Sequence, residues 1–253
     1  MSSIITQAEE IVQDNGFGDV ITLVRGKIEE VELPVQQVDI IISEWMGYFL
    51  LYESMLDTVL WARDKWLTKE GLLFPDHATL WVAGIEDGDY KAEKLGYWDN
   101  VYGFNFSPIR EIAKIEPLVD VVNEQAIMST AHCILDLDLK TCTKEDLTFE
   151  SEWAIKATRD DFCHALVAYF DIDFKAAHRT VSFSTGPAAK YTHWKQTVFY
   201  MDESLVTCRG EEIKGKISCA PNGKNPRDLD ITMDYEFKGE HTKAKNSIQF
   251  KMH

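Results

Sequence analysis

The stretch VDIIISEWMGYFLLYESML, residues 38–56, contains the features from which the fold of this chain can be predicted. It begins with a run of β-branched residues, VDIII, which is typical of a parallel strand buried on both faces. A loop of unusually apolar composition follows, and the segment from Glu53 to Leu67 then carries apolar residues at helical spacing. A strand and a helix in this order indicate part of a parallel α/β sheet.

A similar pattern precedes this stretch. Residues 4–16 show helical spacing, and DVITLVRG, residues 19–26, predicts a short strand. From about Leu72 onward the pattern changes to short strand candidates separated by Gly, Pro, Asn or Asp. In DLDITMDYEF, residues 228–237, the apolar residues alternate strictly, which favours an antiparallel β-barrel or sandwich. The strand candidates are residues 164–174, 181–186, 195–202, 211–221, 228–239 and 246–252.

The composition disfavours several classes of protein. The 253 residues include 42 acidic and 26 basic side chains, a net charge of −16, so we expect no direct nucleic-acid binding and no membrane-surface binding. The acidic surface suits basic partners, or it serves solubility alone. Five cysteines without a CxxC pattern favour a reducing compartment, and no metal-ligand spacing predicts a metal site. No apolar run approaches the roughly 18 residues of a membrane span, and the first residues do not resemble a secretory signal.

Two acids flank the apolar loop at positions where α/β proteins bind ligands. Glu44 directly follows the predicted buried strand, and Glu53 stands at the start of the next helix. The loop between them contains Gly47 and is rich in aromatic residues. Two carboxylates with aromatic side chains suit a flat organic cation, and a guanidinium fits best. The alternative is that both acids are ordinary surface residues and the aromatic side chains belong to the core.

Three further segments have both a functional and a structural interpretation. In RGKIEEVELP, residues 25–34, Glu29 either receives the amine of an adenine or belongs to a solvated acidic turn. In YTHWKQTVFY, residues 191–200, the pair His193 and Trp194 is either part of a site or packed structure. The aromatic residues of segment 88–122 either cover their own domain or dock on a partner.

These segments together resemble the protein arginine N-methyltransferase family. SEWMGYFLLYESML is similar to the double-glutamate loop of that family, and YTHWKQTVFY to its threonine-histidine-tryptophan loop. RGKIEEVELP resembles its adenine-side segment, and GLLFPD, residues 71–76, its domain junction. The resemblance covers nearly the whole chain, and it is closest to the main type I members, which form asymmetric dimethylarginine.

The resemblance implies a Rossmann-like cofactor domain, of which residues 1–75 are the C-terminal part. Residues 76–253 would form the antiparallel β-barrel, with a helical dimerisation arm at about 88–122 that builds a homodimer or heterodimer. It also implies catalysis on arginine-containing protein substrates, such as histones and Arg-Gly-rich proteins, in the cytoplasm and nucleus.

The resemblance also implies the following roles for individual residues. Glu44 and Glu53 would orient the substrate guanidinium, while Met46 and Met55 would line the methyl-transfer site. Tyr48 and Trp194 would form walls of the arginine channel, which His193 helps to shape. S-adenosylmethionine would be the cofactor, held at its adenine by Ile28 and Glu29.

Relatives carry a strand, a glycine-rich loop and a ribose-binding acid ahead of the region that this sequence covers. We therefore expect the cofactor site to be incomplete and the chain to be weakly active or inactive alone. An alternative is a non-catalytic module that binds a full-length methyltransferase subunit. A third possibility is an unstable fragment with an exposed sheet edge.

Overall fold

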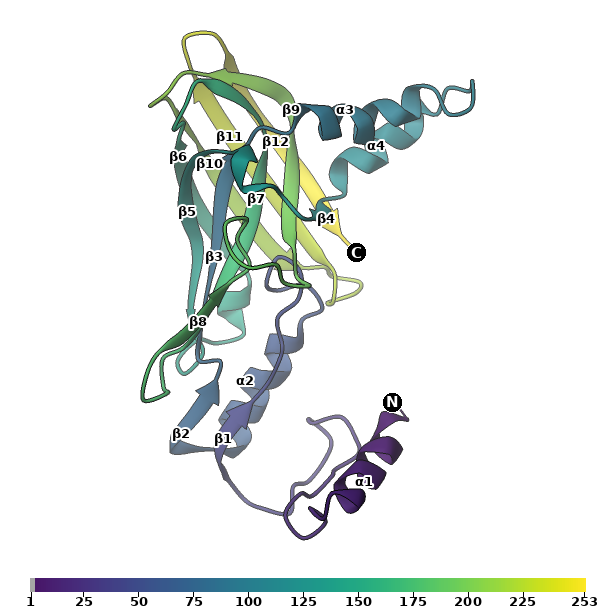
Figure 1. Ribbon diagram of the computed structural model, residues 1–253, viewed down its shortest axis with the longest axis vertical. Coiled ribbons are helices and arrows are strands. Elements are labelled where there is room, and N and C mark those ends of the chain that lie inside the picture. Colours follow the sequence, from purple (N-terminus) through teal and green to yellow (C-terminus); the bar gives the residue numbers. More distant parts are fainter. Residues whose placement is uncertain (1–2) are drawn as a thin grey trace.

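The computed structural model describes residues 3–253, which form a small α/β unit beneath a large β structure (Figure 1). The α/β unit contains α1 (Ile4–Asp14), β1 (Val38–Ile42), α2 (Met55–Trp66) and β2 (Leu67–Phe74). β1 and β2 pair in parallel, with Ile40 opposite Leu72 and Ile42 opposite Phe74. The parallel α/β pattern predicted from the sequence is therefore confirmed, and α2 lies within the predicted helix from Glu53 to Leu67. Within residues 3–253, no helix has both the length and the apolar character of a membrane span.

Two expectations about this unit are wrong. Residues 19–26 form no strand, and Val20 and Ile21 are exposed. β1 is not buried on both faces, because Ile42 is 79% exposed. A parallel strand reaches full burial only when helices cover both faces of its sheet, and the two-stranded sheet of the described residues lacks that cover.

The β structure consists of two antiparallel sheets that curve around a shared core (Figure 1). One sheet has the strand order β12-β11-β10-β6, and the other has the order β4-β9-β7-β3-β5, with β8 paired to β7. Trp153, Phe199 and Phe237 contribute large buried side chains from both sheets to this core. The strands are β3 (His77–Ile85), β4 (Leu118–Asp120), β5 (Ile127–Asp138), β6 (Phe149–Lys156), β7 (Asp161–Phe174), β8 (Val181–Ser184), β9 (Gln196–Thr207), β10 (Glu212–Pro221), β11 (Leu229–Lys238) and β12 (Lys243–Met252). The fold class, an α/β unit followed by an antiparallel barrel, is therefore as predicted.

The aromatic segment forms a helical arm that projects from one side of the barrel (Figure 1). It contains α3 (Gly88–Gly96), the short helix η1 (Tyr97–Asp99) and α4 (Ser107–Ile115), and it returns through β4. Tyr102 and Phe104, between η1 and α4, are 93% and 69% exposed. Two further short 3-10 helices, η2 (Glu124–Ala126) and η3 (Glu145–Leu147), lie in loops of the barrel. The arm leaves apolar surface uncovered in the isolated chain, which is typical of a docking element.

Helix α2 is attached to the barrel by one nearly buried arginine. The Arg63 guanidinium donates to the carbonyl oxygens of Leu139 at 2.8 Å and of Cys142 at 2.6 Å. Leu56, Leu60 and other apolar residues of α2 are buried on the same side. This attachment holds the last turn of α2 against the segment that follows β5.

Replacing Arg63 by methionine is expected to lower the free energy of unfolding by about 2–3 kcal/mol, because two carbonyl groups lose a charged donor while the apolar stem is retained. Urea denaturation measures the change. Arg179→Met alters an exposed arginine on the β7–β8 connection, so it is the matched control and should change stability by less than about 0.5 kcal/mol. Equal losses in the two variants would contradict the role of Arg63.

Candidate functional site

The loop between β1 and α2 is a compact pair of turns. The Gly47 N–H donates to the Leu50 carbonyl at 3.0 Å, and the Tyr52 N–H donates to the Tyr48 carbonyl at 3.1 Å. A Cβ atom on Gly47 would lie 1.9 Å from the carbonyl oxygen of Tyr52, so glycine is required there. Phe49, Leu50, Glu53 and Ser54 all have positive φ angles, between 50° and 77°. Such backbone strain in non-glycine residues persists only where surrounding contacts hold it.

Most of the apolar side chains of this loop belong to the barrel core. Trp45, Phe49 and Leu50 are buried, and the Phe49 ring meets the Phe199 ring edge-on at a centroid distance of 5.2 Å. For these residues the interpretation as core is correct, and they do not line a cation pocket. Tyr48 stays at the surface and stacks on the half-buried Tyr52, with ring centroids 6.4 Å apart. The buried side chains thus anchor the loop, while its polar residues face solvent.

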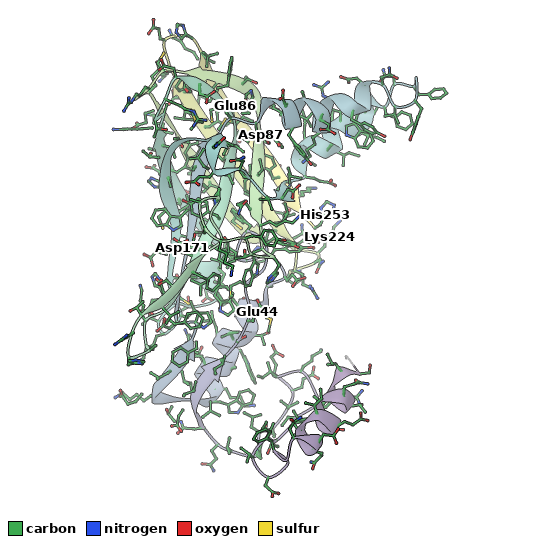
Figure 2. All side chains as sticks on the ribbon, in the orientation of Figure 1. Glu44, Glu86, Asp87, Asp171, Lys224 and His253 are labelled. Carbon is green, nitrogen blue, oxygen red and sulfur yellow. The ribbon has the colours of Figure 1, made fainter. Side chains whose placement is uncertain are left out.

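The two acids stand at the two ends of this loop. Glu44 follows the carboxyl end of β1, and Glu53 directly precedes Ser54 and the first turn of α2. Both side chains are exposed, and Figure 2 shows Glu44 below the barrel, at the junction with the α/β unit. It remains a prediction that the carboxylates of Glu44 and Glu53 bind the same guanidinium group.

Glu53 already pairs with an arginine of the chain itself. Arg227 Nη2 lies 3.0 Å from Glu53 Oε1, and the Glu53 N–H donates to the Arg227 carbonyl at 2.8 Å. The Ser54 hydroxyl donates to the Pro226 carbonyl. These contacts attach the β10–β11 turn to the loop of residues 43–54, called the acidic loop below, and hold Glu53 in its left-handed backbone conformation.

Sequence reasoning missed Arg227, because the residue stands 174 positions from Glu53 and no local motif marks it. The contact shows that an arginine side chain reaches the Glu53 carboxylate.

The predicted histidine-tryptophan pair adjoins the same loop. The Trp194 indole N–H donates to the Met46 carbonyl at 2.8 Å, and the Trp194 ring stacks on Phe183 with centroids 5.6 Å apart. His193 is exposed and its ring lies 3.9 Å from that of Trp194. The structure therefore brings Trp194 to the acidic loop directly and His193 through Trp194. The Met46 side chain itself is buried.

Lys195 connects this segment to the base of the arm. Its ammonium group bonds to Asp120 Oδ1 at 3.1 Å, and this hydrogen bond raises the pKa of Lys195 and contributes to lowering the pKa of Asp120, for which the Val121 N–H is the larger cause.

The predicted adenine-side residues lie on an exposed segment beside α2. The Thr58 hydroxyl, one turn into α2, donates to Glu29 Oε1 at 3.0 Å. Ile28 is half-buried, and Met55, the first residue of α2, is 45% exposed. The structure thus brings Glu29 close to the helix that begins at Met55. A carboxylate that accepts from an amine and an open thioether side chain fit the adenine end of a nucleoside cofactor.

The structure also has a cavity that lies away from the acidic loop and is not lined by these residues. It has a volume of about 980 Å³ and lies on the four-stranded sheet, where Lys214, Asp234 and Lys245 line it. None of the residues predicted from the sequence lines this cavity.

The fold belongs to the class of architecture in which an α/β unit precedes an antiparallel barrel, and an acidic loop joins the two parts. The family model "Arginine methyltransferase oligomerization subdomain" matches residues 76–240. Protein arginine N-methyltransferase 1 of Schizosaccharomyces pombe is 58% identical over 237 residues, which cover 94% of this chain and 70% of the relative. Protein arginine N-methyltransferase 1 of Chlamydomonas reinhardtii is 54% identical over 251 residues, which cover 99% of this chain and 73% of the relative. The chain belongs to the protein arginine N-methyltransferase family.

A solved structure supports the same assignment over the full chain. The Trypanosoma brucei PRMT1 enzyme-prozyme heterotetrameric complex with AdoHcy matches with a TM-score of 0.95 and 44% identity. The match covers 100% of this chain and 80% of that chain. The resemblance recognised in the sequence is therefore confirmed at the level of family and fold.

Proposed function

We propose that this chain carries the arginine-binding part of a protein arginine N-methyltransferase active centre. In this proposal, Glu44 and Glu53 receive the guanidinium group of a substrate protein. The observation that carries it is the pairing of Glu53 with the Arg227 guanidinium, because it supports access of an arginine side chain to this carboxylate. The net charge of −16 favours basic substrates, such as histones and Arg-Gly-rich segments, and the family likeness favours asymmetric dimethylation in the cytoplasm and nucleus.

Orientation and electrostatics account for the chemistry of such a site. A guanidinium has a pKa above about 12, so an ordinary carboxylate does not deprotonate it before reaction. Two carboxylates instead hold the group in plane and draw its positive charge toward the nitrogens they contact. The remaining nitrogen then becomes the better nucleophile and faces the methyl donor. Tyr48 and Trp194 would form walls of the arginine channel, and His193 would support Trp194.

S-adenosylmethionine, when bound, supplies the electrophilic methyl group. Ile28 and Glu29 would hold its adenine end, while Met55, together with Met46, would border the transfer site. Met46 is buried, but Ile28, Glu29 and Met55 have little burial, and α1 has no buried residue. We therefore propose that the 253-residue chain alone binds this cofactor weakly and transfers methyl groups slowly.

Incubation of the purified chain with labelled S-adenosylmethionine and an Arg-Gly-rich peptide tests this proposal. We expect measurable peptide binding but little label transfer. The barrel holds the acidic loop in place, whereas the segment that carries Ile28 and Glu29 is largely exposed. The same peptide with lysine in place of arginine is the control and should bind more weakly. Rapid label transfer would contradict the low activity, and absence of arginine-dependent binding would contradict the site itself.

A second candidate function is a non-catalytic partner of a complete methyltransferase subunit. The observation that favours it is the exposed apolar surface of the arm, at Tyr102 and Phe104, in a chain that matches an oligomerization subdomain. The similar Trypanosoma brucei complex combines an enzyme with a prozyme. A partner of this kind would act through the arm and would not require its own cofactor.

Mixing the chain with the intact relative from Schizosaccharomyces pombe distinguishes the two functions. Light scattering should show a heterodimer, and Tyr102→Ser combined with Phe104→Ser should prevent it without changing the melting temperature. A change in the relative's transfer rate on mixing would support regulation, whereas no heterodimer at any ratio would exclude this candidate.

A further inference from the structure

Three metal-ligating side chains meet at the end of the barrel opposite the acidic loop. Cys208 follows the last residue of β9, and Glu240 and His241 lie in the turn between β11 and β12. The thiol sulfur, a carboxylate oxygen and a ring nitrogen of these residues lie within 4.8 Å of one another. Figure 1 shows these turns at the top of the barrel, far from α2 at its base.

A single glutamate joins the two turns that carry the ligands. Glu211 Oε2 accepts from the Cys208 N–H at 2.8 Å, and Glu211 Oε1 accepts from the Glu240 N–H at 2.7 Å. The Val206 N–H donates to the Thr242 hydroxyl oxygen at 3.1 Å, which adds a second link between the two sides. The backbones on both sides of the cluster are therefore held together without any bond between the ligand side chains.

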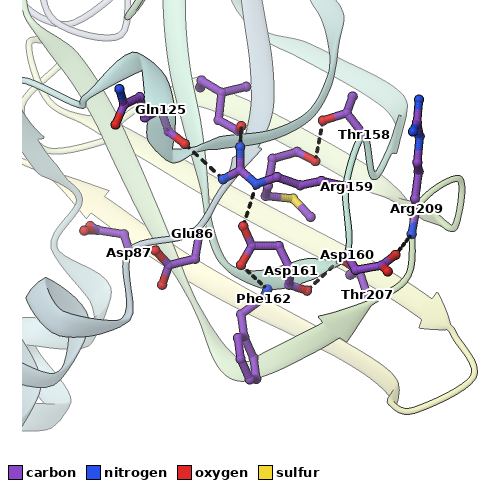
Figure 3. A network of polar contacts seen from close by, with 12 residues as sticks. Glu86, Asp87, Gln125, Thr158, Arg159, Asp160, Asp161, Phe162, Thr207 and Arg209 are labelled. Carbon is purple, nitrogen blue, oxygen red and sulfur yellow. Dashed lines mark hydrogen bonds and ion pairs between the residues drawn. The ribbon is translucent and has the colours of Figure 1, made fainter.

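Neighbouring contacts fix the β9–β10 turn to the rest of the barrel (Figure 3). The Thr207 hydroxyl donates to the Asp161 carbonyl at 2.9 Å, and the Arg209 N–H donates to Asp160 Oδ1 at 2.7 Å. Asp161 in turn accepts from Arg159 Nε at 2.6 Å. Cys208 thus lies between two anchored residues, so little conformational entropy remains to be lost when its sulfur binds a ligand.

The donor set and its surroundings favour a soft divalent cation. Thiolate, imidazole and carboxylate are the three ligand types of protein zinc sites, and three protein ligands leave the fourth position to water. The thiolate is the form of cysteine that binds the cation, so the thiol proton of Cys208 would pass to solvent on binding. Glu240 and His241 are exposed, which leaves the ion a path of entry.

We propose that Cys208, Glu240 and His241 bind one zinc ion, which joins the β9–β10 turn to the β11–β12 turn. The site is independent of methyl transfer, because it lies at the far end of the barrel from the acidic loop. Sequence spacing did not reveal it, since Cys208 and Glu240 stand 32 positions apart and meet only where the connection from β9 to β10 lies beside the β11–β12 turn.

Cobalt titration of the chelator-treated chain tests the proposal directly. We expect one equivalent of Co²⁺ to produce a thiolate-to-cobalt charge-transfer absorption, which Zn²⁺ then abolishes by displacement. Zinc at about 100 times its dissociation constant should raise the melting temperature by about 5–10 °C. The acidic loop plays no part in this experiment, so its result is independent of the proposed methyltransferase site.

Substitutions at the ligands and at one matched cysteine complete the test. Cys208→Ser should remove the charge-transfer absorption, and His241→Gln should weaken cobalt binding at least about 10-fold. Cys133→Ser changes a partly exposed cysteine on β5. This variant should keep both the charge-transfer absorption and the cobalt affinity of the original chain. Circular dichroism confirms that each variant is folded. A charge-transfer band that persists in Cys208→Ser, or no band in the original chain at saturating cobalt, would overturn the proposal.

Discussion

Replacing Phe199 by alanine is expected to lower the free energy of unfolding by about 3–5 kcal/mol, the largest effect of any substitution considered for this chain. Phe199 is fully buried on β9, and its ring meets Phe49 of the acidic loop and Phe250 of β12 at centroid distances of 5.2 and 5.1 Å. The substitution would leave a cavity where the two sheets and the loop meet. Urea denaturation followed by tryptophan fluorescence measures the loss.

The matched control for this prediction is Phe104→Ala. Phe104 is 69% exposed in the arm, so the same deletion of a phenyl ring should change the stability of the monomer by less than about 0.5 kcal/mol. Because Phe49 loses a contact only in Phe199→Ala, that variant should also bind an Arg-Gly-rich peptide less tightly. A loss of stability below about 1 kcal/mol would show that Phe199 does not connect the loop to the core.

Replacing Glu53 by glutamine is expected to raise the dissociation constant of an Arg-Gly-rich peptide about 10- to 150-fold. The change removes the negative charge but retains the shape, so it deletes a charge-assisted hydrogen bond worth about 1.5–3 kcal/mol. Isothermal titration calorimetry of the purified chain measures the affinity without requiring a cofactor. The stability should change little, because Glu53 is exposed and its pair with Arg227 is open to solvent.

Two comparisons separate this effect from a general change in surface charge. Glu30→Gln removes another exposed acid, one that pairs with Lys27 at 3.1 Å, and should leave peptide affinity within about twofold. Glu44→Gln should weaken binding to a similar extent as Glu53→Gln, if both carboxylates receive one guanidinium. Equal affinities of the original chain, Glu44→Gln and Glu53→Gln would refute the proposed arginine site.

Local sequence patterns correctly predicted helices and strands that pair with or pack against another element among residues 3–253. Helix α2 and the strands from β7 to β12 follow from apolar spacing and from turn residues, and each element packs against another one. DVITLVRG, residues 19–26, has strand-forming residues but no strand partner among residues 3–253, so its pattern did not produce a strand. Strand propensity depends on hydrogen-bonding neighbours and on burial.

The candidate site shows the same division between local and long-range information. The positions of Glu44 and Glu53 at a strand end and a helix start followed from the sequence alone, because they depend only on adjacent residues. The burial of the aromatic side chains did not follow from the sequence alone, because Trp45 and Phe49 are buried by contacts with the barrel. The local composition of the loop was equally compatible with a pocket wall and with a core.

The sequence by itself determined the class of fold, the acidic loop and the family resemblance, since periodicity and short motifs are properties of neighbouring residues. Only the tertiary structure decided that Arg227 meets Glu53, that Trp194 bonds to Met46, and that Cys208 lies beside Glu240 and His241. The physical reason is that sheet pairing and barrel closure bring distant turns together, and no local pattern encodes which turns will meet.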